Sequence, residues 1–397
     1  MNALRILLSF FTVLTFGLGC GADPAPRESP KEPGASREDA LSAPPASPRS
    51  TLAAFSTVSS SQVYYLDPVS TVFELSSQGS EWKFSWLPGS AKPGSALTAF
   101  PLANSAPRVY FISNDSRVHE LWWDGTWHDH ALVTQAGDPP PAAADSPLVG
   151  FVRSGYNPSV YYVAAHNRHV HELKWNGLSW GVTDVTERAG APAAAPGSPL
   201  TAFTVKGGEA RVYFVGNSRH VHELWENSDG AWAQQDLNLV TNAPAADNDT
   251  ALTGFATDGT WSHVYYVGDS NRHVIELKFT SQGWTYTNVT PLGAPYTTAP
   301  ATALTSFAVN PGSHPRVYFL LDSNAVGELW SDGASWHLNN LTVYASAPAA
   351  KVNSPLAGFA INGVFSRVYY LAGNDNVMQL AWSGSNWGVT SLTTIAN

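Results

Sequence analysis

The sequence contains little charge and almost no sulfur. Charged residues make up 13% of the 397 residues, about half the share that is usual for soluble proteins. The single cysteine, Cys20, excludes an intramolecular disulfide. With a net charge of −10 and no basic stripe, nothing in the chain would displace counterions from a phosphate backbone, which argues against nucleic acid as a partner.

Sequence signatures of catalysis are also lacking. The chain contains no Gly-x-Ser-x-Gly, no phosphate-binding loop and no His-Glu-x-x-His. We therefore expect a protein that is not an enzyme and that needs no cofactor. Aromatic residues, glycine and proline are plentiful, with 15 Trp, 15 Tyr, 17 Phe, 32 Gly and 28 Pro. This composition favours many short strands and turns over helices.

The first 50 residues differ from the rest of the chain. Arg5 precedes an apolar run from Ile6 to about Leu18, which predicts a signal peptide and is too short for a comfortable membrane span. Cys20 follows Gly-Leu-Gly and resembles the lipidated cysteine of a bacterial lipobox; the alternative is an ordinary secretory signal with an incidental cysteine. We expect residues 1–20 to be a signal peptide and residues 21–50, rich in Pro, Ala and Ser, to be a disordered tether. The protein is then exported, either as an outer-membrane or cell-surface lipoprotein or as a secreted protein, and a lipid anchor would be its only contact with a membrane.

The remainder of the chain is an internal repeat. Variants of the phrase SPLTAF end at Phe55, Phe100, Phe151, Phe203, Phe255, Phe307 and Phe359. From Phe100 onward the spacing is 51 residues and then 52 residues four times, so seven repeats fill residues 51–397. Each repeat contains four strand-like pieces, for example LTAFPL, RVYFIS, RVHELWW and WHDHALV in the second repeat.

Four short strands in a period of about 50 residues are typical of a propeller blade. Closing the blades into a ring removes the exposed sheet edges that an open stack would leave. The predicted fold is therefore all-β, a seven-bladed β-propeller with four-stranded blades and no helix in the repeats. A linear β-solenoid is the structural alternative, although its repeats are usually much shorter.

The central hairpin of the second repeat carries charged and aromatic side chains on one face. If Arg108 lies opposite Glu120, strand alternation places Tyr110 and Trp122 on the same face. A guanidinium and a carboxylate can hold neighbouring sugar hydroxyls, and an aromatic ring can cover the apolar face of the sugar. The same spacing occurs at Arg211/Glu223 and Arg316/Glu328, and a Trp follows in each of these repeats, at Trp127, Trp232 and Trp336.

Other repeats depart from this pattern. The arginine is replaced in repeats 1, 3 and 5, by Gln62, Ser159 and His263. In repeat 7 the arginine is kept as Arg367, but Gln379 replaces the glutamate. If an Arg–Glu pair were needed to hold blades together, all seven repeats should keep it. We therefore favour binding sites over structural ion pairs, with three complete sites in repeats 2, 4 and 6. The trailing tryptophans recur in every repeat, which by itself favours a place in the core for them.

Histidines lie next to the glutamates, at His119, His171 and His222. Alternation places each on the opposite face from its neighbouring glutamate, and each belongs to a different repeat. Metal binding needs several converging ligands, so we expect no metal site.

The repeat R-V-Y-[FY]…E-L…W resembles the fucose-specific β-propeller lectins of fungi and, more closely, the bacterial PLL-type lectins, which form seven-bladed propellers. The resemblance covers residues 50–397. In the fungal family an Arg, a Glu and an aromatic residue line fucose pockets between adjacent blades. The resemblance implies such pockets at Arg108/Glu120, Arg211/Glu223 and Arg316/Glu328, with Arg367 as a weaker fourth, and it implies fucosylated or related glycans as partners. The competing function is a surface-displayed scaffold for protein–protein interaction, since fold alone does not settle function.

Overall fold

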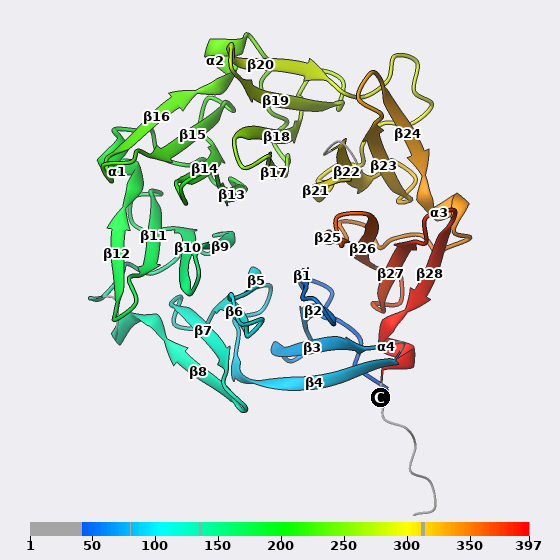
Figure 1. Cartoon of the computed structure of the whole chain (residues 1–397), viewed down its shortest axis with the longest axis horizontal. Helices are drawn as coiled ribbons and strands as arrows, with labels where there is room; N and C mark the ends of the chain where they lie inside the picture. Colours follow the sequence, from blue (N-terminus) through cyan, green and yellow to red (C-terminus); the bar gives the residue numbers. More distant parts are fainter. Residues whose placement is uncertain (1–41, 80, 135–136, 311–313, 397) are drawn as a thin grey trace, which may run out of the picture. The chain divides into compact units, whose positions relative to one another are not determined.

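The computed structural model describes residues 42–79, 81–134, 137–310 and 314–396. Within these residues the strands form seven four-stranded antiparallel sheets arranged in a ring (Figure 1). The first strand of each sheet lies nearest the centre of the ring and the fourth lies at the periphery. The predicted seven-bladed β-propeller is thus confirmed, and the solenoid alternative is excluded.

The strands follow the four pieces predicted for each repeat. The innermost strands of blades 1 to 7 are β1 (Ala53–Ser56), β5 (Leu97–Pro101), β9 (Leu148–Ser154), β13 (Leu200–Thr204), β17 (Leu252–Thr257), β21 (Leu304–Val309) and β25 (Leu356–Ile361). The second strands are β2 (Ser61–Leu66), β6 (Pro107–Ile112), β10 (Asn157–Val163), β14 (Ala210–Val215), β18 (Trp261–Val267), β22 (His314–Leu320) and β26 (Phe365–Leu371).

The two outer strands of each blade complete the sheet. The third strands are β3 (Thr71–Gln78), β7 (Val118–Trp123), β11 (Val170–Trp175), β15 (Val221–Glu226), β19 (Val274–Thr280), β23 (Val326–Ser331) and β27 (Val377–Trp382). The fourth strands are β4 (Glu81–Ser90), β8 (Trp127–Ala131), β12 (Trp180–Asp184), β16 (Trp232–Asp236), β20 (Gly283–Asn288), β24 (Trp336–Asn340) and β28 (Trp387–Ser391).

Single helical turns follow several fourth strands, contrary to the expectation of repeats without helices. They are η1 (Leu132–Thr134), α1 (Val185–Ala189), α2 (Leu237–Thr241), α3 (Leu341–Tyr344) and α4 (Leu392–Ile395). The last residue of the preceding strand begins the turn. The Asp184 side chain accepts a hydrogen bond from the backbone N–H of Glu187, and Asp236 and Asn340 cap α2 and α3 in the same way. In the sequence, an Asp or Asn at the end of the fourth strand is the signal that could have predicted these turns.

The hydrophobic core lies between blades. Seven clusters of buried residues occur within the described part of the chain, and each combines side chains of two neighbouring blades. In blade 4, for example, Tyr213 and Phe214 are adjacent and both fully buried, because each faces a different neighbouring blade. Burial on both faces explains why the second strands are continuous apolar runs rather than alternating ones.

The first residue of the SPLTAF phrase has a backbone role that explains its restriction to Ser or Thr. The Ser146 hydroxyl accepts a hydrogen bond from the backbone N–H of Val163 at 2.9 Å. The equivalent hydroxyl makes this contact in the other six blades as well, from Ser50, Ser95, Ser198, Thr250, Thr302 and Ser354. Each hydroxyl thereby satisfies a buried donor at the end of the second strand.

The folded unit begins before the predicted boundary at residue 51. Ala43 and Ala46 are buried in the cluster between blades 7 and 1, the backbone N–H of Ala46 donates to the carbonyl of Asp375, and the Tyr65 hydroxyl donates to the carbonyl of Pro44. Residues 42–50 therefore belong to the propeller and not to a disordered tether. The predicted signal peptide, Cys20 and the tether up to residue 41 lie outside the described residues.

Ring closure uses side chains and loops instead of a shared strand. Blade 1 consists of β1–β4 and blade 7 of β25–β28, so each terminal blade is complete in itself. The cluster between them contains Leu52 from the start of the unit and Leu392 and Ala396 from its end. The two ends of the folded unit meet at this junction.

Candidate functional site

The space between two successive blades is called a junction here and is named by its blades. Junctions 2/3, 4/5 and 6/7 each contain a guanidinium–carboxylate pair from the first-named blade. The Nε–Oε1 distance is 3.3 Å for Arg108–Glu120, 3.7 Å for Arg211–Glu223 and 3.8 Å for Arg316–Glu328. The structure therefore brings together all three predicted Arg–Glu pairs.

The register of the hairpin differs from the predicted one by two residues. Glu120 lies opposite Tyr110, and Arg108 lies opposite Trp122. The reason is a wider turn, in which the backbone N–H of Ser113 donates to the carbonyl of Arg117. A shift of two residues keeps every side chain on its face, so the four predicted residues still face one junction.

A buried tyrosine holds each carboxylate. The hydroxyls of Tyr110, Tyr213 and Tyr318 donate to Oε1 of Glu120, Glu223 and Glu328 at 2.8, 2.9 and 3.0 Å. These are the tyrosines of the repeated Val-Tyr pair, and they are fully buried. The carboxylates thus sit at the floor of the junction with a fixed orientation.

The arginines are held along one edge only. Nη1 of Arg108 and of Arg316 donates to the carbonyl of the preceding proline at 3.1 Å, whereas Nη2 of these two arginines has no hydrogen-bond partner among the described residues. Arg211 differs because its Nη2 donates to Glu209 at 3.2 Å. Donors on the outer edge of the guanidinium can therefore bind a hydroxyl group of a ligand.

Burial raises the pKa of the three carboxyl groups. The pKa of Glu223 rises to about 7, because desolvation outweighs the opposing effects of Arg211 and of the Tyr213 hydroxyl. The pKa values of Glu120 and Glu328 are raised by the same cause. A ligand hydroxyl donating to these oxygens would favour the ionised form.

The aromatic walls come from two blades. Trp122 and Trp330 lie opposite the arginines, with the guanidinium carbons of Arg108 and Arg316 at 5.7 and 5.3 Å from their ring centroids. Trp225 has the equivalent place in blade 4. Blades 2, 4 and 6 carry a tryptophan here, whereas blades 1, 3, 5 and 7 carry Ser76, Lys174, Lys278 and Ala381. This alternation was visible in the sequence.

The second aromatic wall is the fourth-strand tryptophan of the following blade, whereas the sequence left open which blade supplies it. Trp180, Trp284 and Trp387 pack edge-on against Tyr110, Tyr213 and Tyr318. The predicted Trp127, Trp232 and Trp336 instead pack against Tyr64, Tyr161 and Tyr265 of the preceding blades and belong to junctions 1/2, 3/4 and 5/6. A fourth strand faces the preceding blade, and spacing within one repeat does not reveal this.

Each of the three junctions encloses a cavity. Their volumes are about 350 Å³ at junction 2/3, 240 Å³ at junction 4/5 and 680 Å³ at junction 6/7. Besides the groups described above, the outer-strand residue paired with the glutamate differs among them, being His130, Gln235 or Asn339. The three cavities therefore share a floor and walls but differ at one polar position.

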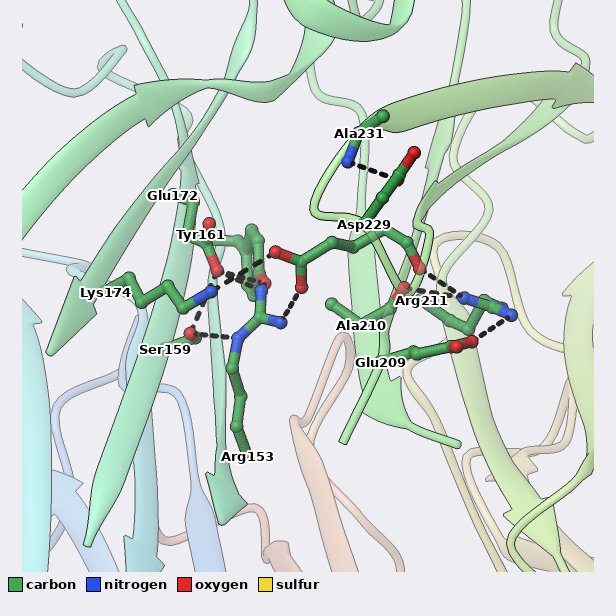
Figure 2. A network of polar contacts seen from close by, with 11 residues as sticks. Arg153, Ser159, Tyr161, Glu172, Lys174, Glu209, Ala210, Arg211, Asp229 and Ala231 are labelled. Atoms are coloured by element: carbon green, nitrogen blue, oxygen red, sulfur yellow. Dashed lines mark hydrogen bonds and ion pairs between the residues drawn. The ribbon is translucent and has the colours of Figure 1, made fainter. Parts of the chain in front are cut away.

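Junction 3/4 contains a guanidinium that sequence analysis missed. Arg153, from β9, takes the place left by Ser159 and contacts the carboxylate of Glu172 (Figure 2). Its Nε donates to the Ser159 hydroxyl at 2.7 Å, and its Nη1 forms an ion pair with Glu226 of blade 4. Only 7% of the Arg153 side chain is exposed, and every guanidinium nitrogen has a protein partner. This arginine connects two blades, and four of its five N–H donors are already engaged by protein groups.

The remaining junctions have other substitutes. In blade 5, His263 Nδ1 lies 2.8 Å from Glu276 Oε1. In blade 7, the Gln379 amide donates to the Tyr369 hydroxyl at 3.0 Å, and burial lowers the pKa of Arg367. In blade 1, Gln62 stands near Tyr64 and Glu74. The predicted fourth site at Arg367 thus has the guanidinium without a carboxylate.

The histidines next to the glutamates lie within their own blades. His119 Nδ1 lies 2.7 Å from Asp129, whereas His171 and His222 pack against Tyr162 and Phe214. The described residues contain no group of three or more His, Cys, Asp or Glu side chains that could hold a metal ion. In that same part of the chain, no helix is long and apolar enough to cross a membrane.

The comparison with protein families identifies one family. The family model of the fungal fucose-specific lectins matches residues 146–345. No curated protein matches the chain.

Several solved lectins share the fold. The Aleuria aurantia lectin, described as a six-bladed β-propeller with a novel fucose recognition mode, is 19% identical, with 86% of this chain and 95% of that chain covered and a TM-score of 0.54. The SapL1 lectin, solved with α-methyl fucoside, is 21% identical, with coverages of 76% and 96% and a TM-score of 0.53. The BP39L lectin from Burkholderia pseudomallei is 12% identical, with coverages of 85% and 97% and a TM-score of 0.69. At these identities the likeness shows the fold.

Proposed function

Because the chain belongs to the family of fungal fucose-specific lectins, we propose that it binds fucose or a closely related monosaccharide at junctions 2/3, 4/5 and 6/7. The observation that carries the proposal is the recurrence, in alternate blades, of an arginine beside a buried glutamate and between two aromatic walls. Membership of a lectin family supports carbohydrate binding in general, and these residues supply the finer assignment.

Each group has a part in this proposal. The arginine donates to ring or hydroxyl oxygens, the glutamate accepts from a hydroxyl, and the aromatic walls cover the apolar side of the sugar. Few atoms contribute at one junction, so a single site should bind a monosaccharide with a Kd on the order of mM to tens of μM. Three sites on one rigid ring gain strength on a dense glycan surface through effective concentration.

A glycan array tests the proposal directly. The wild-type chain should bind fucosylated glycans, and the triple variant R108A/R211A/R316A should lose this binding while keeping its fold. Arg188, an exposed residue of α1 outside the three junctions, provides the matched control R188A. Silence of the wild-type protein across the array, together with capture of a protein partner, would favour the scaffold function instead.

The same proposal includes export. A signal peptide ending at Cys20, followed by a tether, would display the propeller on the cell surface as a lipoprotein or release it as a secreted lectin. Either location gives the binding sites access to extracellular glycans.

A further inference from the structure

Junction 1/2 differs from the three candidate fucose sites in its charge. Glu74 occupies the place of Glu120, Glu223 and Glu328, and the Tyr64 hydroxyl donates to its Oε1 at 2.7 Å. Its cross-strand neighbours are changed, since Gln62 and Ser76 stand where blades 2, 4 and 6 have arginine and tryptophan. This junction has therefore lost both the cation and one indole ring.

Glu74 is the only carboxylate at this position that lacks a nitrogen partner among the described residues. The other five each have one, from Arg108, Arg153, Arg211, His263 and Arg316. Glu74 is 8% exposed, and within the described part of the chain its carboxylate has one hydrogen bond, from the Tyr64 hydroxyl, and lines the junction cavity. Burial raises the pKa of Glu74, and no cation opposes that rise. The ionised form of a buried carboxylate is costly without a cation, and a cationic ligand would stabilise that form.

The junction also offers space and walls suited to a sugar. It contains an open cavity of about 830 Å³, larger than those at junctions 2/3, 4/5 and 6/7, and Ser76 lines it where those junctions have a tryptophan. Trp127 lines the cavity, and Gln62 and Ser85 add polar groups, whereas the ring of Phe84 packs against Phe73 on the opposite face of blade 1. Two further charged residues lie at its exposed rim: Asp124, and Lys83, which forms no ion pair with Glu74.

We propose that junction 1/2 is a second saccharide site, which selects amino sugars whose free ammonium group pairs with Glu74. The ammonium takes the place that a guanidinium nitrogen has at the other junctions, and the ring of the sugar lies against Trp127. The site is separate from the fucose sites and does not depend on them.

Titration of the full exported chain with glucosamine, N-acetylglucosamine and glucose tests this inference. Ligand-observed NMR or calorimetry should give glucosamine an affinity at least about tenfold above that of the two neutral sugars, because a hydrogen bond to a charged group is stronger by that factor or more. Equal binding of glucosamine and N-acetylglucosamine, or no binding of glucosamine at millimolar concentration, would overturn the inference.

Two variants locate the site. Glu74→Gln should abolish the preference for glucosamine; glutamine fits this position, since Gln379 occupies it in blade 7 and contacts Tyr369. Gln62→Arg should also abolish the preference by supplying an internal cation. Glu81→Gln, which changes the same charge on the exposed surface of blade 1, should leave it intact. Retention of the preference in Glu74→Gln would refute the assignment.

Two additional measurements separate the alternatives. Fucose binding measured on the same samples should be unchanged in Glu74→Gln, so failure of the amino-sugar site and failure of the fucose proposal remain distinguishable. Nα-acetyl-lysine methylamide carries an ammonium group without a sugar ring. If it binds as well as glucosamine does, the junction recognises the ammonium alone, and the assignment to amino sugars is wrong.

Discussion

Arg153 and Arg211 offer a comparison that separates structural from ligand-binding arginines. Both lie beside a buried glutamate, yet Arg153 is 7% exposed and contacts two carboxylates in two blades, whereas Arg211 is 18% exposed and its Nε lies 3.7 Å from Glu223. Replacing each by leucine keeps most of the aliphatic stem and removes the charge. The two variants should differ strongly in stability.

The magnitudes follow from what each substitution leaves behind. Arg153→Leu leaves Glu172 buried without a cation, and breaking such a pair costs about 3–5 kcal/mol. Arg211→Leu should cost about 1 kcal/mol, the net contribution of one hydrogen bond, because the pKa of Glu223 is already about 7 and its carboxyl can take up a proton near neutral pH. Sugar binding should show the reverse order, with a loss at junction 4/5 for Arg211→Leu and no loss for Arg153→Leu.

Denaturant unfolding followed by the fluorescence of the 15 tryptophans measures the stability difference, and calorimetry with fucose counts the sites. A Glu226→Gln variant serves as a second probe of the Arg153 contacts, because it removes the negative charge in blade 4 that Arg153 and Lys174 of blade 3 share. Equal destabilisation by the two arginine substitutions would show that Arg211 is also structural. Unchanged fucose binding in Arg211→Leu would place the sugar elsewhere.

Three further predictions concern other groups. The raised pKa of Glu223 means that its contribution to stability is fully present below about pH 4.5 and is lost as the pH rises to about 7; Glu223→Gln should remove this component from a plot of unfolding free energy against pH. Trp284→Ala should eliminate one fucose site in calorimetry, whereas Trp232→Ala, which alters junction 3/4, should eliminate none, and the opposite result would contradict the assignment of walls to the following blade. Cys20→Ser should move the protein from the membrane fraction to the soluble fraction, and unchanged fractionation would mean that the cysteine is not lipidated.

The fold was predictable because the repeat is explicit in the sequence. Seven copies of the SPLTAF phrase set the number of blades, and the Ser or Thr that opens each copy is required by one backbone hydrogen bond, as Ser146 illustrates. The lower boundary was not predictable, since composition alone does not reveal that Ala43 and Ala46 are buried between blades 7 and 1.

The candidate site was predictable in part. The pairing of Arg211 with Glu223 follows from alternation, which survives a register error of two residues. The identity of the second wall does not follow, because Trp284 belongs to the next repeat and only the three-dimensional arrangement of blades brings it to Arg211. Arg153 was missed because it reaches Glu172 from a different strand. The presence of Ser159 in place of the arginine of repeats 2, 4 and 6 therefore did not mean that this junction lacks a guanidinium.

The three candidate fucose sites are unequally spaced around the ring. Around the propeller, two of the intervals between candidate fucose sites span two blades, whereas the interval from junction 6/7 to junction 2/3 spans three. The chain enters the folded unit within this wide interval, between blades 7 and 1. No rotation of the ring by a whole number of blades superimposes the three candidate sites on themselves. A layer that matches the unequal spacing can be engaged in one rotational setting only, so the footprint of the protein on a surface is oriented with respect to the point where its chain begins.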